Sequence, residues 1–200
     1  ENAQKYFNKY NKAKRTLAAM EIQQKQNDEE LAYLESVLNA LDTAKDDADL
    51  AEIRTELAES GFIRRQPQKK GQSKPKKAKP MRYISSDGYE ILVGKSNLQN
   101  DELTFKIAKK DELWFHAKDI PGSHVVITGN LNPSDEVKTD AAELAAYYSK
   151  ARLSNLVQVD MIEAKKLNKP TGGKPGFVTY TGQKTLRVTP EEEKFKAMKL

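Results

Sequence analysis

The sequence predicts an α+β protein: a long coiled-coil helix followed by a globular domain with a mainly antiparallel sheet and a few helices. Residues 1–60 contain no glycine or proline and repeat apolar side chains at alternating spacings of four and three, as in a helix that pairs along one seam. Residues 61–81 are basic, contain three prolines and offer few side chains to a core, which is typical of a flexible linker. Residues 82–200 alternate short β-favouring runs with turn signals, which indicates an α+β domain.

The seam of the first segment predicts one continuous helix to about Ala44, roughly 65 Å long at 1.5 Å per residue. Asp46 and Asp47 then begin a shorter helix, and Gly61 is placed as its C-terminal stop. Nine of eleven seam positions are apolar: Tyr6, Tyr10, Ala13, Leu17, Met20, Gln24, Asn27, Leu31, Leu34, Leu38 and Leu41. The shorter helix can cover only part of this seam, so we expect the chain to self-associate through the coiled coil. Because Glu1 already lies in helical sequence, we also expect a piece of a longer protein.

The globular part is predicted to contain short strands and two helices. A hairpin turn is expected at residues 86–88, and helices are expected over 97–108 and after a Ser134 cap. The second helix should bury Val137, Ala141, Leu144, Tyr148 and Ala151. Strands are expected over 82–85, 89–93, 114–117, 124–128, 157–160, 163–167, 177–180 and 185–188.

Composition excludes several classes of function. The formal net charge is +5, which favours polyanionic partners, and it is unevenly divided: −5 over residues 1–60, +8 over 61–80 and +2 over 81–200. The absence of cysteine excludes a disulfide scaffold, a thiolate zinc finger, an iron–sulfur cluster and a cysteine nucleophile, and it fits the cytoplasm. No apolar run approaches the roughly 18 residues needed to span a membrane.

Two histidines are the first candidates for chemistry. His116 and His124 lie near Asp111 and Asp119, but no carboxylate or cysteine completes a zinc-binding spacing, so no metal and no cofactor are expected. If residues 114–117 form a strand, Trp114 and His116 share one face. The rings then have two alternative roles, hydrogen bonding inside the fold or contact with RNA.

Enzymatic activity is not expected. Ser123 lies in Pro121-Gly122-Ser123-His124, but the Gly-x-Ser-x-Gly frame of a nucleophile elbow is missing. Residues 171–176 lack the hydroxyl residue of a phosphate loop. A hydrolase that uses His116, Asp119 and Ser123 is the weakest alternative.

Basic side chains are the better candidates for function. Four lysines bracket the loop 171–176, which suits a backbone-amide cradle for nucleic-acid phosphate, although a plain flexible turn is an equal alternative. The predicted nucleic-acid contacts are His116, Lys118, His124, Arg152, Lys165, Lys166, Lys169 and Lys174. The lysines of the linker and the basic, aromatic tip over residues 5–15 are further candidates for polyanion contact.

Several blocks resemble a known family. Residues 92–97, 100–104, 114–127, 169–176 and 185–188 are similar to the NFACT-R domain. The motif residues of these blocks and their surroundings are Asp111, Trp114, Asp119, Pro121, Gly122 and Ser123. Residues 1–7 and 33–36 resemble the second arm of the coiled coil in the same NFACT family.

The resemblance implies an RNA-binding domain over residues 82–200 of a ribosome quality-control factor. Such factors bind the large ribosomal subunit, its rRNA and tRNA, and append alanine tails to stalled nascent chains in the cytoplasm. The tRNA-selecting residues known for the family lie outside this sequence, so none can be assigned here. The alternative is an adhesin, because bacterial members of the family are also described as fibronectin/fibrinogen-binding; that role would place the protein at the cell surface.

Overall fold

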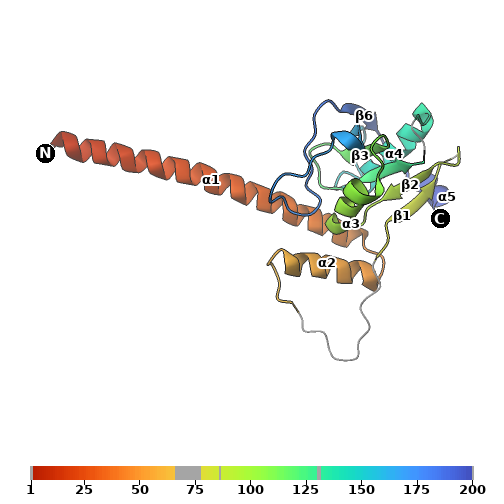
Figure 1. The fold of residues 1–200 in the computed structure, drawn as a ribbon, viewed down its shortest axis with the longest axis horizontal. Coiled ribbons are helices and arrows are strands. Elements are labelled where there is room, and N and C mark those ends of the chain that lie inside the picture. Colours follow the sequence, from red (N-terminus) through yellow and green to blue (C-terminus); the bar gives the residue numbers. More distant parts are fainter. Residues whose placement is uncertain (1, 66–77, 86, 130–131, 200) are drawn as a thin grey trace. The chain divides into compact units, whose positions relative to one another are not determined.

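The computed structural model describes residues 2–65, 78–85, 87–129 and 132–199 (Figure 1). The chain divides into two compact units, residues 1–35 and residues 36–200. Most of helix α1 (Asn2–Thr43) makes up the first unit, and its side chains are almost all exposed, including Leu17 and Leu31 of the predicted seam. The long helix is therefore confirmed, and its pairing with a second helix stays a prediction.

Helix α2 (Asp47–Glu59) begins and ends where the sequence predicts. The side chain of Asp46 caps its start by accepting a hydrogen bond from the Asp49 amide at 2.9 Å. At its end Gly61 has φ +83, and the Phe62 amide donates to the Leu57 carbonyl at 2.9 Å, which is the pairing of a glycine-terminated helix.

The end of α1 that lies in the second unit buries a different face from the predicted seam. Val37 and Ala40 are buried, whereas the seam residues Leu38 and Leu41 are 60% and 41% exposed. The buried face lies one position before the seam because this turn of the helix packs within a folded domain. Leucine spacing alone does not reveal that change of environment.

Within the described residues, the second unit contains a six-stranded sheet in the order β1-β2-β4-β3-β5-β6, and every neighbouring pair is antiparallel. This confirms the predicted fold class. The strands are β1 (Met81–Ile84), β2 (Glu90–Val93), β3 (Leu113–Ala117), β4 (Val125–Thr128), β5 (Val157–Glu163) and β6 (Lys184–Val188). A hairpin joins β1 to β2, with Gly88 at φ +79 as the turn pattern predicts.

Helices cover both faces of the sheet (Figure 1). Helix α4 (Asp135–Tyr147), capped by Ser134 as predicted, packs across one face and buries Val137, Ala141 and Leu144. On the other face, α3 (Asn97–Glu102) runs directly into a π-helical turn, Leu103–Ile107. A second core lies on that face and contains Leu92, Leu103, Trp114, Val126, Ile162 and Leu167.

Two predicted strands are wrong. Residues 163–167 do not form a separate strand, because β5 already extends to Glu163 and a short 3-10 helix (Ala164–Lys166) turns the chain away. Residues 177–180 contribute only an isolated bridge between Asn168 and Thr179, so their β-favouring side chains cover the sheet instead of extending it.

A C-terminal helix, α5 (Glu192–Met198), was not predicted from the sequence; it lies beside β1. Residues 66–77 of the predicted linker and Ser86 of the hairpin turn lie outside the described residues. The predicted domain boundaries stay predictions. No helix in the described parts of the chain is both long and apolar enough to cross a membrane.

Candidate nucleic-acid interface

The aromatic rings predicted to share a strand face lie together in the second core. The Trp114 indole is fully buried, and its ring centroid lies 5.7 Å from that of His116 in a stacked arrangement. His124 and Tyr180 meet the indole edge-on, with centroids at 4.9 and 5.3 Å. Strand alternation thus placed Trp114 and His116 correctly, and Trp114 has no face left for stacking on a base.

His124 is a structural residue. Its side chain is 2% exposed, its backbone amide donates to Asn100 Oδ1 at 2.9 Å, and its Nδ1 lies 2.7 Å from Thr104 Oγ1. Burial, reinforced by the nearby His116, lowers the pKa of His124 well below its usual value, so the ring is neutral near pH 7. The predicted contact of His124 with RNA is therefore replaced by the hydrogen-bonded role.

His116 is half-buried and also neutral. Burial lowers its pKa to about 4, against the opposing effects of a hydrogen bond with the Gly122 backbone and the charges of Asp160 and Asp119. The Asp160 carboxylate accepts hydrogen bonds from Thr185 Oγ1 at 2.6 Å and from the Tyr180 hydroxyl at 3.1 Å. His116 thus lacks the positive charge that a phosphate contact would use.

The proposed hydrolase residues do not resemble an activated nucleophile. Ser123 is buried, and its backbone amide donates to the Tyr148 carbonyl at 3.0 Å. Asp119 is exposed in a turn, with a left-handed φ of 53. Among the described residues, no three His, Asp or Glu side chains lie close enough together to hold a metal ion.

The lysines around the loop 171–176 are mostly occupied by acidic residues of the same chain. Lys165 Nζ lies 3.0 Å from Asp111 and 3.1 Å from Glu163, and Lys166 Nζ lies 3.5 Å from the same Glu163 carboxylate. These two lysines and Asp111 therefore form an exposed ion-pair cluster, in which the lysines are only partly available to RNA.

The predicted phosphate cradle already holds a carboxylate. Asp101 forms an ion pair with Lys169 through one oxygen, and its other oxygen accepts a hydrogen bond from the Gly176 amide at 2.9 Å. Lys174 Nζ lies over the Phe62 ring, 4.9 Å from its centroid. Asp101 thus takes the amide and the charge that the sequence had suggested for nucleic-acid phosphate.

Three basic residues that form no ion pair within the described parts of the chain belong to segments around the end of β3 and the start of β5. The Lys118 amide donates to the Gln158 carbonyl at 2.9 Å, and Gln158 is the cross-strand partner of Arg187 on β6. Alternation places Lys118, Gln158 and Arg187 in one row on the face opposite α4. Arg152 is exposed in the loop that leads into β5.

We call Lys118, Arg152 and Arg187 the cationic end of the sheet. Within the described parts of the chain, Lys118, Arg152 and Arg187 form no ion pair. Arg187 was missed from the sequence, although the alternation of Leu186 and Val188 toward the α4 core would have placed its side chain on the opposite face.

Motif residues fix the shape of this end. The Pro121 carbonyl accepts a hydrogen bond from the Lys150 amide at 2.9 Å, and Gly122 bridges to Ser149. A Cβ on Gly122 would lie only 2.9 Å from Ser149 Cβ, so only glycine allows the two loops to approach this closely. The Pro-Gly-Ser-His motif therefore acts as a joint between two loops of the cationic end.

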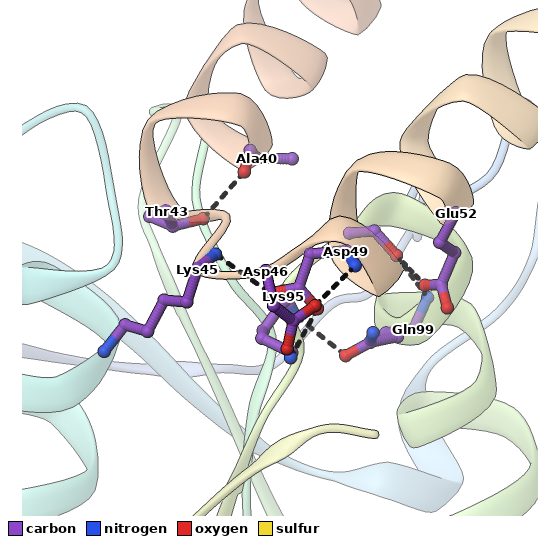
Figure 2. A network of polar contacts seen from close by, with 9 residues as sticks. Ala40, Thr43, Lys45, Asp46, Asp49, Glu52, Lys95 and Gln99 are labelled. Carbon is purple, nitrogen blue, oxygen red and sulfur yellow. Dashed lines mark hydrogen bonds and ion pairs between the residues drawn. The ribbon is translucent and has the colours of Figure 1, made fainter. Parts of the chain in front are cut away.

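A second set of charges is buried between α2 and α3 (Figure 2). Lys95 pairs with Asp49, and the two side chains are only 11% and 2% exposed; Asp49 also accepts a hydrogen bond from the Lys45 amide at 3.0 Å. The Ser96 hydroxyl donates to Glu52. We call Asp49, Glu52, Lys95, Ser96, Asn97 and their partners Ser36 and Glu56 the interlock.

Asn97 completes the interlock by donating to Ser36 Oγ at 2.8 Å and to Glu56 Oε1 at 2.9 Å. These bonds join the end of α1, α2 and the start of α3, so the helical segment from Ser36 is part of the same folded unit as the sheet.

Comparisons with known proteins agree with this architecture. Residues 1–77 match the family model described as NFACT N-terminal and middle domains, and residues 79–182 match the model described as NFACT protein RNA binding domain. A solved structure, the C-terminal part of the fibronectin/fibrinogen-binding protein from Streptococcus suis, is similar with a TM-score of 0.90 at 64% identity, and the match covers 100% of this chain and 79% of that one.

Curated relatives extend beyond the chain. The chain is 64% identical over its full length to the Rqc2 homolog RqcH of Streptococcus suis and 62% identical to that of Streptococcus pneumoniae. It is 46% identical over 195 residues to the Rqc2 homolog RqcH of Bacillus subtilis. The chain spans about a third of the length of these relatives, 34–36%. By these matches, and by a fold that agrees with them, the chain belongs to the NFACT family.

Proposed function

We propose that this chain is the RNA-binding part of a ribosome quality-control factor. The factor binds the large ribosomal subunit and tRNA during alanine tailing of stalled nascent chains. The match to the NFACT RNA-binding model and the identity to RqcH proteins support the assignment. The observation that carries it is the cationic end, where Lys118, Arg152 and Arg187 remain without acidic partners among the described residues. In this proposal the chain acts in the cytoplasm as a binding module and makes or breaks no covalent bond.

The physical basis is counterion release. An unpaired surface cation that meets a phosphate displaces a condensed counterion, so each contact makes binding more sensitive to salt. Lysines that already pair with Asp111 or Glu163 must first give up those partners, and they add less. The unpaired cations should therefore dominate the affinity for RNA.

The experiment measures binding of the chain to large-subunit rRNA over a range of salt concentrations. The triple variant Lys118→Ala, Arg152→Ala, Arg187→Ala should reduce the slope of log K against log salt by about 2 to 3, because each phosphate contact contributes about 0.7 to 0.9. The matched control is Lys165→Ala, Lys166→Ala, which removes paired lysines and should change the slope by less than 1. Binding that is independent of salt, or equal slopes for the two variants, would contradict the proposal.

The second candidate is attachment to fibronectin or fibrinogen, as named for the structurally similar protein from Streptococcus suis. It predicts saturable binding of fibronectin by this chain at physiological salt that survives an excess of competing RNA. Loss of all fibronectin binding when RNA is added would show general attraction of polyanions and would remove this candidate.

We also propose that α1 pairs with another helix through its exposed seam, in which Leu17, Met20 and Leu31 are 59–63% exposed. Sedimentation should show self-association of the chain, and Leu17→Asp should weaken it by placing a charge in the seam. A strict monomer at high concentration would contradict the pairing.

A further inference from the structure

Two leucines project from the loop 149–156, which connects α4 to β5 at the cationic end. Leu153 is 92% exposed and Leu156 is 66% exposed, which makes Leu153 the most exposed large apolar side chain among the described residues. Single exposed leucines are common on protein surfaces. Two in one short loop, which also contains the exposed Arg152, are a more specific feature.

The loop is held in a defined shape by hydrogen bonds. The Arg152 amide donates to the Ser149 carbonyl at 3.1 Å, and the Ser154 amide donates to the Ala151 carbonyl at 2.8 Å. At the base of the loop, the Leu156 amide donates to Thr189 Oγ1 at 3.1 Å. The leucines are thus presented on a fixed turn.

Leu156 adopts a backbone conformation that leucine normally avoids. Its φ of 55 lies in the left-handed region, which glycine and asparagine enter far more readily. Asp119 is the other non-glycine residue with positive φ in the described part of the chain, and it follows Lys118 at the same end of the sheet. Strained residues of this kind concentrate at functional sites.

The charges near the leucines indicate the chemical class of the partner. Arg152 directly precedes Leu153 in the loop, and Lys118 and Arg187 both lie opposite Gln158, two residues after Leu156. These three cations form no ion pair within the described residues, so the complementary surface is anionic and also offers apolar contact. RNA meets both conditions where its bases are unstacked, because phosphates flank exposed base faces. Apolar side chains inserted at opened base steps are a known mode of nucleic-acid contact.

We propose that the loop 149–156 recognises unpaired nucleotides in RNA, with Leu153 and Leu156 against the faces of unstacked bases and the cationic end on the flanking phosphates. This inference rests on the proposed RNA-binding function and specifies its substrate class: RNA with a bulge or loop in preference to a continuous duplex. The leucines supply the preference, and the cations supply most of the affinity.

The experiment compares two RNA hairpins of equal length, one fully paired and one with a three-nucleotide bulge that contains 2-aminopurine. The wild-type chain should bind the bulged hairpin roughly 5- to 10-fold more tightly, and the fluorescence of 2-aminopurine should rise as the base is unstacked. The variant Leu153→Ser, Leu156→Ser should bind both hairpins equally and leave the fluorescence unchanged. Its dependence on salt should match that of the wild type.

The controls separate the two proposals. Leu50→Ser removes a leucine that is 47% exposed on α2, and this variant should keep the preference for the bulged hairpin. The single variant Leu153→Ser avoids any change at the strained position and should lose part of that preference.

Salt-dependent binding without a preference for the bulge would overturn the inference and leave RNA binding intact. The leucine variant could instead bind both RNAs like the wild type but no longer bind large ribosomal subunits. That result would assign the loop to a protein partner and would also overturn the inference. Failure of the wild type to bind either RNA would overturn RNA binding itself.

Discussion

The interlock and the cationic end contain the same kinds of charged residue in opposite states. Lys95 and Asp49 in the interlock are buried against each other, whereas Arg152 and Arg187 are exposed, Lys118 is half-buried, and none of the three forms an ion pair among the described residues. Buried charges need a partner, because an unpaired one has lost its water without compensation. Surface charges stay hydrated at little cost and remain available to another molecule.

This difference in burial and pairing separates charged residues that stabilise the fold from charged residues that are available to bind a partner. Amino-acid composition cannot distinguish these two roles. Charges of the interlock join α2 to the start of α3, and we expect the exposed charges of the cationic end to contribute little to stability. Substitutions should therefore divide into those that unfold the domain and those that change only what it binds.

The largest effect is expected from Lys95→Met. This variant leaves the Asp49 carboxylate, 2% exposed, without its ammonium partner, and it should lower the free energy of unfolding by about 3–5 kcal/mol. Urea denaturation of the chain measures the loss. The double variant Asp49→Leu, Lys95→Met should recover much of the stability, because neither charge then remains buried. The control is Lys165→Met, which removes a lysine from an exposed ion pair. If Lys95→Met loses no more stability than this control, the buried pair contributes no more to stability than a surface pair.

A smaller effect is expected at Asn97. Replacement by alanine removes two buried hydrogen bonds, to Ser36 and Glu56, and should cost about 1–3 kcal/mol. Asn97→Asp should cost more than the alanine variant at pH 7, because it places a second carboxylate beside Glu56. The difference between the two variants should shrink as the pH falls toward 4. Equal stabilities of Asn97→Asp and Asn97→Ala at pH 7 would contradict the buried contact with Glu56.

The two histidines predict a dependence of stability on pH. The pKa of His116 is lowered to about 4 in the folded chain, below the 6.5 of an unfolded histidine, so only the unfolded state gains this proton between those values. Stability should fall as the pH drops from 6.5 toward 4, by at most about 1.4 kcal/mol per pH unit from His116, and His124 acts in the same direction.

Denaturation of the wild type and of His116→Asn at several pH values tests this dependence. The variant should show a shallower decline in stability between pH 6.5 and 4.5, because asparagine does not titrate. An identical decline would mean that carboxylates account for the whole effect.

The smallest effect on stability is expected at Arg187. Arg187→Ala should change the free energy of unfolding by less than about 0.5 kcal/mol, because the side chain is exposed. The same variant should reduce the salt slope of RNA binding by about 1. A large loss of stability would show that Arg187 belongs with the interlock residues rather than with the binding surface.

Local signals in the sequence were sufficient for most of the fold. Asp46, Gly61 and Ser134 mark helix ends through their own backbone and side-chain chemistry, and Gly88 permits the hairpin turn. Each of these signals acts within a few residues, so it can be read without knowledge of the tertiary structure. The strand predicted over residues 177–180 was wrong, because a β-favouring composition fits any half-buried extended segment.

The ion pairing of the candidate binding residues could not be predicted from the sequence, because it depends on segments that are distant in sequence. Lys165 pairs with Asp111 across 54 positions, and Lys169 pairs with Asp101 across 68. Nothing in the sequence near these lysines shows that a carboxylate will meet them. Lys118 and Arg152 were predicted as contacts for the same reason as the paired lysines, and only the fold separates the two groups.

Strand β6 has a further consequence for how the domain avoids aggregation. It lies at an open margin of the sheet, where unsatisfied backbone groups can recruit an extended segment from another molecule. Lys184 and Arg187 place bulky charges along this margin, and such charges discourage strand-to-strand association. Arg187 would thus protect this strand in addition to its proposed contact with RNA, and we expect a β-favouring neutral replacement such as valine to promote association between strands of different molecules.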